Sequence, residues 1–359
     1  MFDLDHLPGR SFRNAGKKWL YFSGTAYLGL AHHPAFQQHL HDGLLRYGAN
    51  FGGSRLSNMR LSIFEAAEQL LAEWLNQEAV LTVSSGSLAG QLLIKYLQEQ
   101  GDCYFSPSIH PALSGSQPIF KGSLLEWQNF ILQEEFSTSK PVYLLSSSMD
   151  ALKANVIDFN WLKHLDPSRK YYVVIDDSHG LGVLGEDGQG IITQLPSFAH
   201  IEYILIGSMG KALGTPGGLI AGSRTLIQAL WQSPFFGGAS PIIPAYLYAF
   251  INSQEIIRSQ RKALRFNIAN FKHGINSYTG FRHILEHPVF HVDDAQIGPY
   301  LQGEEILISA FPYPSEQDPI VSRIVINASH ESADIEKLST LIQRFYKKNG
   351  PLSIKKDLD

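Results

Sequence analysis

The chain has 359 residues, of which 44% are hydrophobic and 17% charged, so it is long enough for a large domain with a buried core and a smaller second domain. The net charge of −4 gives no basic surface that would favour nucleic acid as a partner. The single cysteine excludes an intrachain disulfide and fits a reducing compartment, and no apolar run reaches the roughly 18 residues of a membrane span. The start, MFDLDHLPGR, lacks the pattern of a signal peptide, so we expect a cytoplasmic protein that binds no membrane.

Residues 60–223 alternate between helical and strand-like patterns. The segment LSIFEAAEQLLAEWLNQ has apolar residues at helical spacing on one face. Five short runs are apolar at every position and rich in Val, Ile and Tyr: 79–84, 142–147, 171–176, 203–208 and 218–223. Such strands are covered on both faces, which predicts a mostly parallel sheet flanked by helices. In these sheets the reactive groups gather where strands end.

The pattern changes after residue 243. Residues 244–275 predict one long helix opened by a proline, and two strand-like runs follow at 304–311 and 322–329. A final helix is predicted from the apolar face of Ile335, Leu338, Ile342 and Phe345. We therefore predict a large domain over 46–243 and a smaller α+β domain over 244–359. Residues 1–45 form an N-terminal segment that packs with one of them.

The segment ILIGSMGKALGTPGGLIAGS, residues 204–223, is a glycine-rich turn with one lysine between two predicted strands. Two interpretations of this region match poorly. Gly180, Gly182 and Gly185 match a dinucleotide fingerprint, but DDSH separates them from their strand and no helical pattern follows. Ser208 and Lys211 match the S-x-x-K of serine acyl-enzymes, but the chain has no K-T-G partner.

The third interpretation is a lysine that forms a Schiff base with an aldehyde cofactor. Desolvation between apolar strands favours the neutral amine that this reaction needs. The run YYVVIDDSHG places Asp176 at a strand end, where a carboxylate can pair with a protonated pyridine nitrogen and make the ring an electron sink. Lys211 alone would be a solvated loop lysine. Together with Asp176, His179 and Ser208 it is the candidate catalytic lysine.

The paired motifs VIDDSHGLGVLGEDGQG and IGSMGKALGTPGG closely resemble those of the α-oxoamine synthases. These pyridoxal-phosphate enzymes of the aspartate-aminotransferase fold, which include 8-amino-7-oxononanoate synthase and glycine C-acetyltransferase, join an amino acid to an acyl-CoA. The likeness extends from about YFSGTAYLGLAHHP to SRIVINASHESADIEKL, which is most of the chain. It implies an α/β fold of type I among PLP-dependent transferases, with a large domain around a mostly parallel sheet and a smaller α+β domain.

The same resemblance implies the reaction. We expect a C-acyltransferase of the 8-amino-7-oxononanoate synthase kind, which condenses alanine with a pimeloyl thioester, loses carbon dioxide and serves biotin biosynthesis. The thioester is carried either by CoA or by a carrier protein. The alternative is an aminotransferase, or another enzyme that transforms amino acids, on the same fold.

The resemblance also assigns a catalytic and cofactor-binding centre. Lys211 would hold pyridoxal phosphate as a Schiff base and then take the α-proton of the substrate. Asp176 would pair with the pyridine nitrogen, and His179 would bond to the phenolic oxygen of the ring. Ser208 would contact the phosphate, and His110 would stack on the ring and orient it with the substrate.

Further phosphate and substrate contacts follow from the resemblance. Gly86 and Ser87, in SSGSLAG, would hold the phosphate at a helix N-terminus. Ser240, in GGASP, would contact the phosphate in the neighbouring subunit, which implies a homodimer with composite sites. Arg323 would bind the substrate carboxylate in a bidentate way.

Four departures from the family pattern lie toward the substrate side or the dimer contact. Thr25 stands where the family has an asparagine that helps to bind the substrate carboxylate, and Phe64 stands where many members have histidine. The strand end at 144–148 lacks an acidic residue, and GGASP has fewer hydroxyls than usual. The cofactor chemistry is therefore better defined than the substrate.

Four histidines near the N-terminus, His32, His33, His39 and His41, could suggest a metal site. No carboxylate or cysteine completes a ligand set around them, and AHHP is usual at this point in the family. We interpret these histidines as structural and predict no metal.

Overall fold

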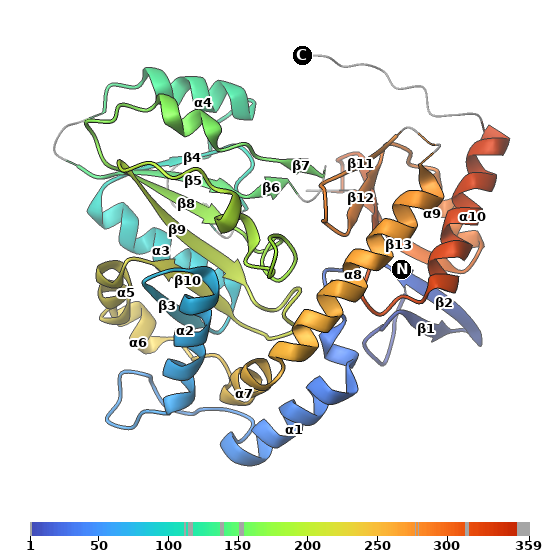
Figure 1. Cartoon of the computed structure of the whole chain (residues 1–359), viewed down its shortest axis with the longest axis horizontal. Helices are drawn as coiled ribbons and strands as arrows, with labels where there is room; N and C mark the ends of the chain where they lie inside the picture. The colour runs from blue at the N-terminus through green and yellow to red at the C-terminus, as the bar shows by residue number, and fades with distance from the viewer. Residues whose placement is uncertain are drawn as a thin grey trace. The chain divides into compact units, whose positions relative to one another are not determined.

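The computed structural model describes residues 2–110, 113, 118–136, 140–150, 154–276, 278, 280–312 and 316–349 (Figure 1). The chain divides into two compact units. Unit 1 comprises residues 1–33, 151–155 and 255–359, and unit 2 comprises residues 34–150 and 156–254. The domain limits expected at residues 45 and 243 stay predictions. Within the described residues, no helix has both the length and the apolar character that crossing a membrane requires.

Unit 2 is built on a six-stranded mixed sheet with the order β3-β10-β9-β8-β5-β4. Its strands are β3 (Ala79–Val83), β4 (Asp102–Phe105), β5 (Val142–Ser147), β8 (Tyr171–Asp176), β9 (Ile201–Ser208) and β10 (Gly218–Gly222). Neighbours from β4 to β9 are parallel, whereas β10 is antiparallel to both β9 and β3. The predicted mostly parallel sheet is therefore confirmed, with one reversed strand.

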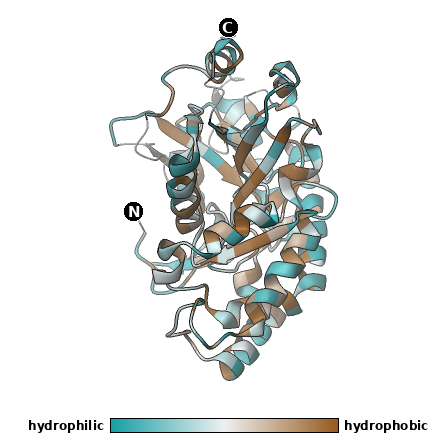
Figure 2. Cartoon of the chain, turned by 90° about the vertical axis from the view of Figure 1, so that its left-hand side faces the viewer, coloured by the Kyte–Doolittle hydropathy of each residue, from teal (hydrophilic) through white to brown (hydrophobic). Residues whose placement is uncertain are grey.

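The helices of unit 2 pack against this sheet or against one another. They are α1 (Pro34–Tyr47), α2 (Ser62–Leu75), α3 (Gly86–Gln100), α4 (Leu124–Gln133), α5 (Arg224–Trp231), α6 (Pro234–Gly238) and α7 (Pro244–Asn252). Shorter elements are β6 (Met149–Asp150), β7 (Asn155–Val156) and the 3-10 helices η3 (Asn160–His164) and η4 (Gly190–Gln194). Every residue of β5 and β10 is buried, as expected for strands covered on both faces. In Figure 2 the strands are largely hydrophobic, whereas the helices carry hydrophilic and hydrophobic residues side by side.

Unit 1 contains a second six-stranded sheet with the order β1-β2-β13-β14-β12-β11. Its elements are β1 (Ser11–Asn14), β2 (Lys17–Phe22), η1 (Leu30–His32), α8 (Gln254–Ile275), β11 (Phe281–His283), β12 (Val289–Val292), α9 (Ile297–Gly303), β13 (Ile306–Pro312), β14 (Ile320–Val325) and α10 (Ser332–Asn349). The N-terminal strand β2 pairs in parallel with β13. The N-terminal hairpin is thus part of the same sheet as the C-terminal strands.

The single helix predicted over residues 244–275 is wrong. The structure has two helices, α7 and α8, separated by Ser253. Ser253 is fully buried, and its hydroxyl lies 2.9 Å from Nδ1 of His39 on α1. The side-chain amide of Gln254 donates to the carbonyl of Phe250. These side-chain contacts compete with the helical hydrogen bonds at the junction, a tertiary effect that periodicity does not reveal.

Candidate active site

Lys211 and His179 meet at one edge of the unit 2 sheet. Strands β8 and β9 are parallel neighbours, so the segments that follow them leave the sheet at the same edge. His179 comes three residues after β8, and Lys211 three residues after β9. The Lys211 Nζ atom lies 2.8 Å from His179 Nε2, which is hydrogen-bond distance, and both side chains are partly buried. The structure therefore brings together the two residues that the motifs had paired.

The lysine turn is held by backbone contacts. The Met209 and Thr215 amides donate to the Gly217 and Met209 carbonyls at 2.9 and 3.0 Å. Gly182 has a φ of +83°, and a Cβ at this position would lie 2.9 Å from the Cβ of Ala212. Only glycine fits such a backbone at such a distance. The glycine run after β8 thus packs directly against the turn that carries the lysine.

The two adjacent carboxylates after β8 have different surroundings. Asp176 is partly exposed, and its Oδ1 accepts the amide N–H of Ser178 at 2.9 Å. Asp177 is only 2% exposed, and its Oδ2 accepts the amide N–H of Ile191 at 2.7 Å. Burial raises the pKa of Asp177 to about 7. Asp176 is therefore partly accessible at the sheet edge, whereas Asp177 is bound to the loop behind it.

Ser208 adjoins the start of helix α3. The Ser85 hydroxyl caps this helix by accepting the Leu88 amide N–H, and Gly86 is its first residue. A Cβ on Gly86 would lie 2.9 Å from the Cβ of Ser208, so the two residues are in close contact. The first amides of a helix lack intrahelical acceptors and carry the positive end of the helix dipole. The amides of Gly86 and Ser87, with the Ser208 hydroxyl, can therefore hold an anion.

Two further predicted residues lie on exposed loops of unit 2. His110 follows β4, and its loop is tied to the end of β5 because the Ser147 hydroxyl donates to the Ser108 carbonyl at 3.0 Å. Ser240 follows α6 and is exposed. The ring-stacking role of His110 and the cross-subunit role of Ser240 remain predictions.

The two predicted carboxylate-binding residues lie in unit 1. Arg323 is on β14, and its guanidinium lies 5.9 Å from the centre of the Phe311 ring. Burial raises the pKa of Tyr27, and the neighbouring Arg323 guanidinium opposes that rise. Thr25 is two residues before Tyr27, whose amide donates to the Thr25 carbonyl at 2.8 Å. Thr25 is thus close to Tyr27 in the chain, and Arg323 is close to it in space.

Arg55 and Glu68 form a largely buried ion pair that no sequence motif indicated. Arg55, 7% exposed, donates to both carboxylate oxygens of Glu68 at 2.6 and 2.9 Å. Its guanidinium lies 4.4 Å from the ring centre of Phe64, the residue that replaces the histidine of many family members. The same carboxylate accepts the amide and hydroxyl of Thr82, which precedes the helix that begins at Gly86. Arg55, Phe64 and Glu68 line a cavity of about 250 Å³.

Metal ligands do not gather in the part of the chain that the structure describes. No group of three or more His, Cys, Asp or Glu side chains lies there in an arrangement that could hold a metal ion. At the sheet edge the described residues supply an amine, an imidazole, a carboxylate and the start of a helix.

Comparison with known proteins decides the family. The family model for aminotransferase class I and II matches residues 147–342, which is more than half of the chain. An 8-amino-7-oxononanoate synthase of Dechloromonas aromatica is 33% identical over 280 residues, which cover 74% of this chain and 71% of the relative. The chain belongs to the aminotransferase class I and II family.

Two more comparisons place it within that family. An 8-amino-7-oxononanoate synthase of Aeromonas hydrophila is 28% identical over 351 residues, which cover 93% of this chain and 87% of the relative. A solved serine palmitoyltransferase with PLP superposes with a TM-score of 0.82 at 17% identity and covers 97% of this chain and 93% of its own. This aminotransferase class I and II protein therefore has the PLP-dependent fold of the α-oxoamine synthases, as the sequence motifs predicted.

Proposed function

We propose that this protein binds pyridoxal 5'-phosphate through Lys211 and condenses an amino acid with an acyl thioester. The observation that carries the proposal is the 2.8 Å contact between Lys211 Nζ and His179 Nε2 at the edge that also holds Asp176 and Ser208. A lysine amine, an acid for a ring nitrogen and a helix start for a phosphate are the groups that this cofactor requires. The residues present therefore fit it.

The cofactor supplies an aldehyde that reacts with amines and a ring that withdraws electrons from the α-carbon of a bound amino acid. The Lys211 amine would hold it covalently and would accept the α-proton of the substrate at Nζ. The Asp176 carboxylate stabilises a proton on the ring nitrogen, and the His179 imidazole orients the ring oxygen next to it. Ser208 and the amides of Gly86 and Ser87 hold the phosphate.

Recognition of the substrates is assigned to other residues. Arg323 and Thr25 bind the amino-acid carboxylate, and His110 orients ring and substrate. Ser240 of one protomer completes the phosphate site of its partner, so the active form is a homodimer. In the overall reaction a bond forms between the α-carbon and the acyl carbonyl carbon, the thioester C–S bond breaks, and the thiol leaves.

The relatives named 8-amino-7-oxononanoate synthase favour alanine and a pimeloyl thioester as the substrate pair, with loss of carbon dioxide and a place in biotin biosynthesis. The family description favours a second candidate, an aminotransferase. The two differ in what they need from the second substrate: the first consumes a thioester, and the second consumes a keto acid. A cytoplasmic location stays a prediction from the lone cysteine, Cys103, which is buried and free.

The test is an absorption spectrum of the purified protein with pyridoxal phosphate, recorded before and after addition of alanine, glycine or serine. We expect a visible band that requires Lys211 and disappears in Lys211→Ala. One amino acid should change it. Mass spectrometry after addition of pimeloyl-CoA then separates the candidates, because only the acyltransferase releases free CoA and a carbon–carbon condensation product. A wild-type spectrum identical to that of Lys211→Ala would overturn the proposal.

A further inference from the structure

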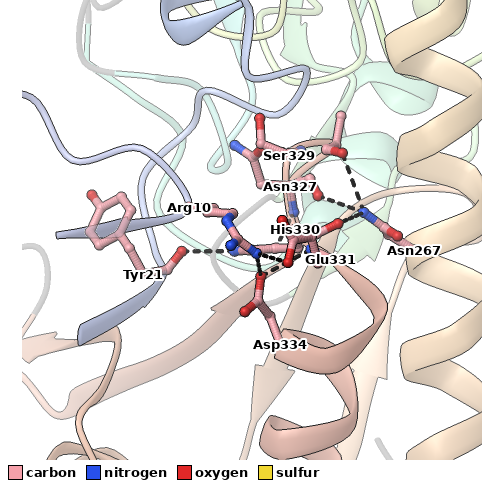
Figure 3. Close-up of polar contacts among 9 residues, drawn as sticks. Arg10, Tyr21, Asn267, Asn327, Ser329, His330, Glu331 and Asp334 are labelled. Atoms are coloured by element: carbon pink, nitrogen blue, oxygen red, sulfur yellow. Dashed lines mark hydrogen bonds and ion pairs between the residues drawn. The ribbon is translucent and has the colours of Figure 1, made fainter. Parts of the chain in front are cut away.

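A tight turn connects β14, which carries Arg323, to helix α10. We call its residues, Asn327, Ala328, Ser329 and His330, the 327–330 turn (Figure 3). Within it, Asn327 Oδ1 accepts the Ser329 amide N–H at 2.7 Å, and His330 Nδ1 accepts the Asn327 amide N–H at 2.9 Å. Because Nδ1 is an acceptor, the neutral imidazole carries its proton on Nε2. Side chains of the turn therefore close it, and the Nε2–H group of His330 can donate to a residue outside the turn.

The turn holds the segment 21–28, in which Thr25 lies. His330 Nε2 donates to the Tyr21 carbonyl at 2.9 Å, and Asn327 Nδ2 donates to the Ala26 carbonyl at 2.5 Å. The Ala328 amide donates to the Tyr27 carbonyl at 2.9 Å. Just beyond the segment, Gly29 has a φ of +64°, and a Cβ there would collide with the Ser329 hydroxyl. The segment is thus bound to the turn on both sides of Thr25.

The turn itself is fixed from behind. Asn267 on α8 is 4% exposed, and its Nδ2 donates to the carbonyls of Asn327 at 3.0 Å and His330 at 2.9 Å. Arg10 forms ion pairs of 2.7 Å with both Glu331 and Asp334 at the start of α10 (Figure 3). Buried amide hydrogen bonds of this kind fix a backbone because leaving their carbonyls unpaired is costly. The turn is therefore the fixed element, and segment 21–28 takes its position from it.

A second link joins the same segment to the strand pair that carries Arg323. The Ser23 and Ser309 hydroxyl oxygens are 2.6 Å apart, and Ser309 on β13 is the cross-strand partner of Arg323 on β14. Arg323 itself lies only four residues before Asn327. The residues on either side of Thr25 are thus anchored to β13, the neighbour of the strand that carries Arg323, and to the turn that follows that strand.

We propose that Asn327 and His330 are positioning residues for the amino-acid carboxylate: they hold the segment of Thr25 in register with Arg323. The inference rests on the proposed function, in which Thr25 and Arg323 bind that carboxylate. Two donors grip one carboxylate only if their separation is fixed to about half an ångström, which requires supporting hydrogen bonds of this kind. Asn327 and His330 act through Thr25 and Arg323 and do not touch the substrate.

The test measures amino-acid binding to the holoenzyme in isosteric variants. Asn327→Asp keeps an oxygen that accepts the Ser329 amide N–H but replaces the Nδ2 donor to the Ala26 carbonyl with a carboxylate oxygen, which cannot donate. His330→Asn keeps an acceptor for the Asn327 amide but is too short to reach Tyr21, whereas His330→Gln can still donate there. The matched control is Gln343→Glu, which removes an amide donor to the Gly274 carbonyl elsewhere in unit 1 and adds the same charge as Asn327→Asp.

Each protein is titrated spectroscopically with the amino acid to which the wild type responds and with the amide of that amino acid, which lacks the carboxylate. We expect Asn327→Asp and His330→Asn to raise the Kd of the amino acid about tenfold, the effect of losing one well-placed hydrogen bond to a charge. The Kd of the amide should stay unchanged, and His330→Gln should restore amino-acid binding. The control should bind both ligands like the wild type.

Two results would overturn the inference alone. Either Asn327→Asp and His330→Asn bind the amino acid as the wild type does, or they lose the amino acid and its amide equally, as a general structural defect would produce. A different result would contradict the proposed function on which the inference rests. If the wild type itself binds the amino acid no better than the amide, carboxylate recognition by Thr25 and Arg323 is wrong, and the proposed function must be revised first.

Discussion

Protonation of His330 should destabilise unit 1 in acid. The imidazole is buried, accepts at Nδ1 from Asn327 and donates at Nε2 to Tyr21, so a second ring proton would break the bond at Nδ1. Burial lowers the pKa of His330 from 6.5 to about 4; the nearby Arg10 acts in the same direction, and the Tyr21 carbonyl and Asp334 oppose it. The folded state therefore favours the neutral ring.

The sign and size of the effect follow from proton linkage. A histidine with a depressed pKa contributes its full stability above the unfolded value of 6.5, and this contribution is lost as the pH falls toward the folded value of about 4. The gap between the two pKa values corresponds to about 3 kcal/mol, or a few hundredfold in the unfolding equilibrium. His330→Gln, which can donate to Tyr21 and does not titrate, should lack this loss.

Hydrogen exchange read by mass spectrometry is the suitable assay, because unfolding of a chain with two units need not be a single transition. Peptides from β2 and α10 report on unit 1. Between pH 7.5 and 4.5, corrected for intrinsic exchange, the wild type should lose protection in these peptides and His330→Gln should lose less. Other groups titrate in both proteins and cancel in the comparison. Equal pH dependence in the two proteins would refute the reasoning.

Three further predictions concern unit 2. The pKa of the buried Asp177 is raised to about 7, so its ionisation opposes folding. Asp177→Asn should therefore stabilise unit 2 relative to the wild type as the pH rises from 4 to above 7, by up to about 4 kcal/mol. Hydrogen exchange of peptides from β8 and β9 measures this difference, and a difference that does not grow with pH would contradict the prediction. Gly182→Ala should lower the free energy of unfolding by about 2–4 kcal/mol, because Gly182 has a positive φ and an added Cβ would lie 2.9 Å from Ala212. It should also weaken the Lys211-dependent absorption band. The control is Gly210→Ala, which should be tolerated because the nearest neighbour of its added Cβ is 3.6 Å away. Gly86→Ala should raise the Kd of pyridoxal phosphate about tenfold, because the added methyl group would push against Ser208. A fluorescence titration measures this Kd, and an unchanged value would argue against the phosphate site.

The elements that the sequence predicted best are those whose hydrophobic pattern is set locally. The five continuously apolar runs are the strands β3, β5, β8, β9 and β10, and the apolar face that includes Phe345 belongs to α10. A strand covered on both faces needs apolar residues at every position, so its pattern is readable without knowing its neighbours. The sequence did not show that β10 runs antiparallel to β9. The direction of a strand depends on which neighbour it pairs with, and its own apolar pattern does not reveal that partner.

Side-chain contacts between distant segments were beyond the sequence reasoning. The break at Ser253 depends on His39, and the buried pair of Arg55 and Glu68 joins a loop to a helix. Asp176 is the last residue of β8, whereas Asp177 follows the strand and is buried where it accepts the Ile191 amide. The two adjacent letters do not show this difference, because it depends on a loop that returns 14 residues later.

By itself, the sequence determined the family and the PLP-dependent fold, because short motifs at strand ends are contiguous in the chain; the roles of the motif residues stay predictions. Only the tertiary structure decided that Lys211 meets His179 at 2.8 Å and that the 327–330 turn binds the segment of Thr25, which lies 301 positions away at Ala26. The physical reason is that such contacts depend on sheet order and loop closure, which are set by the packing of the whole unit rather than by any local run of residues.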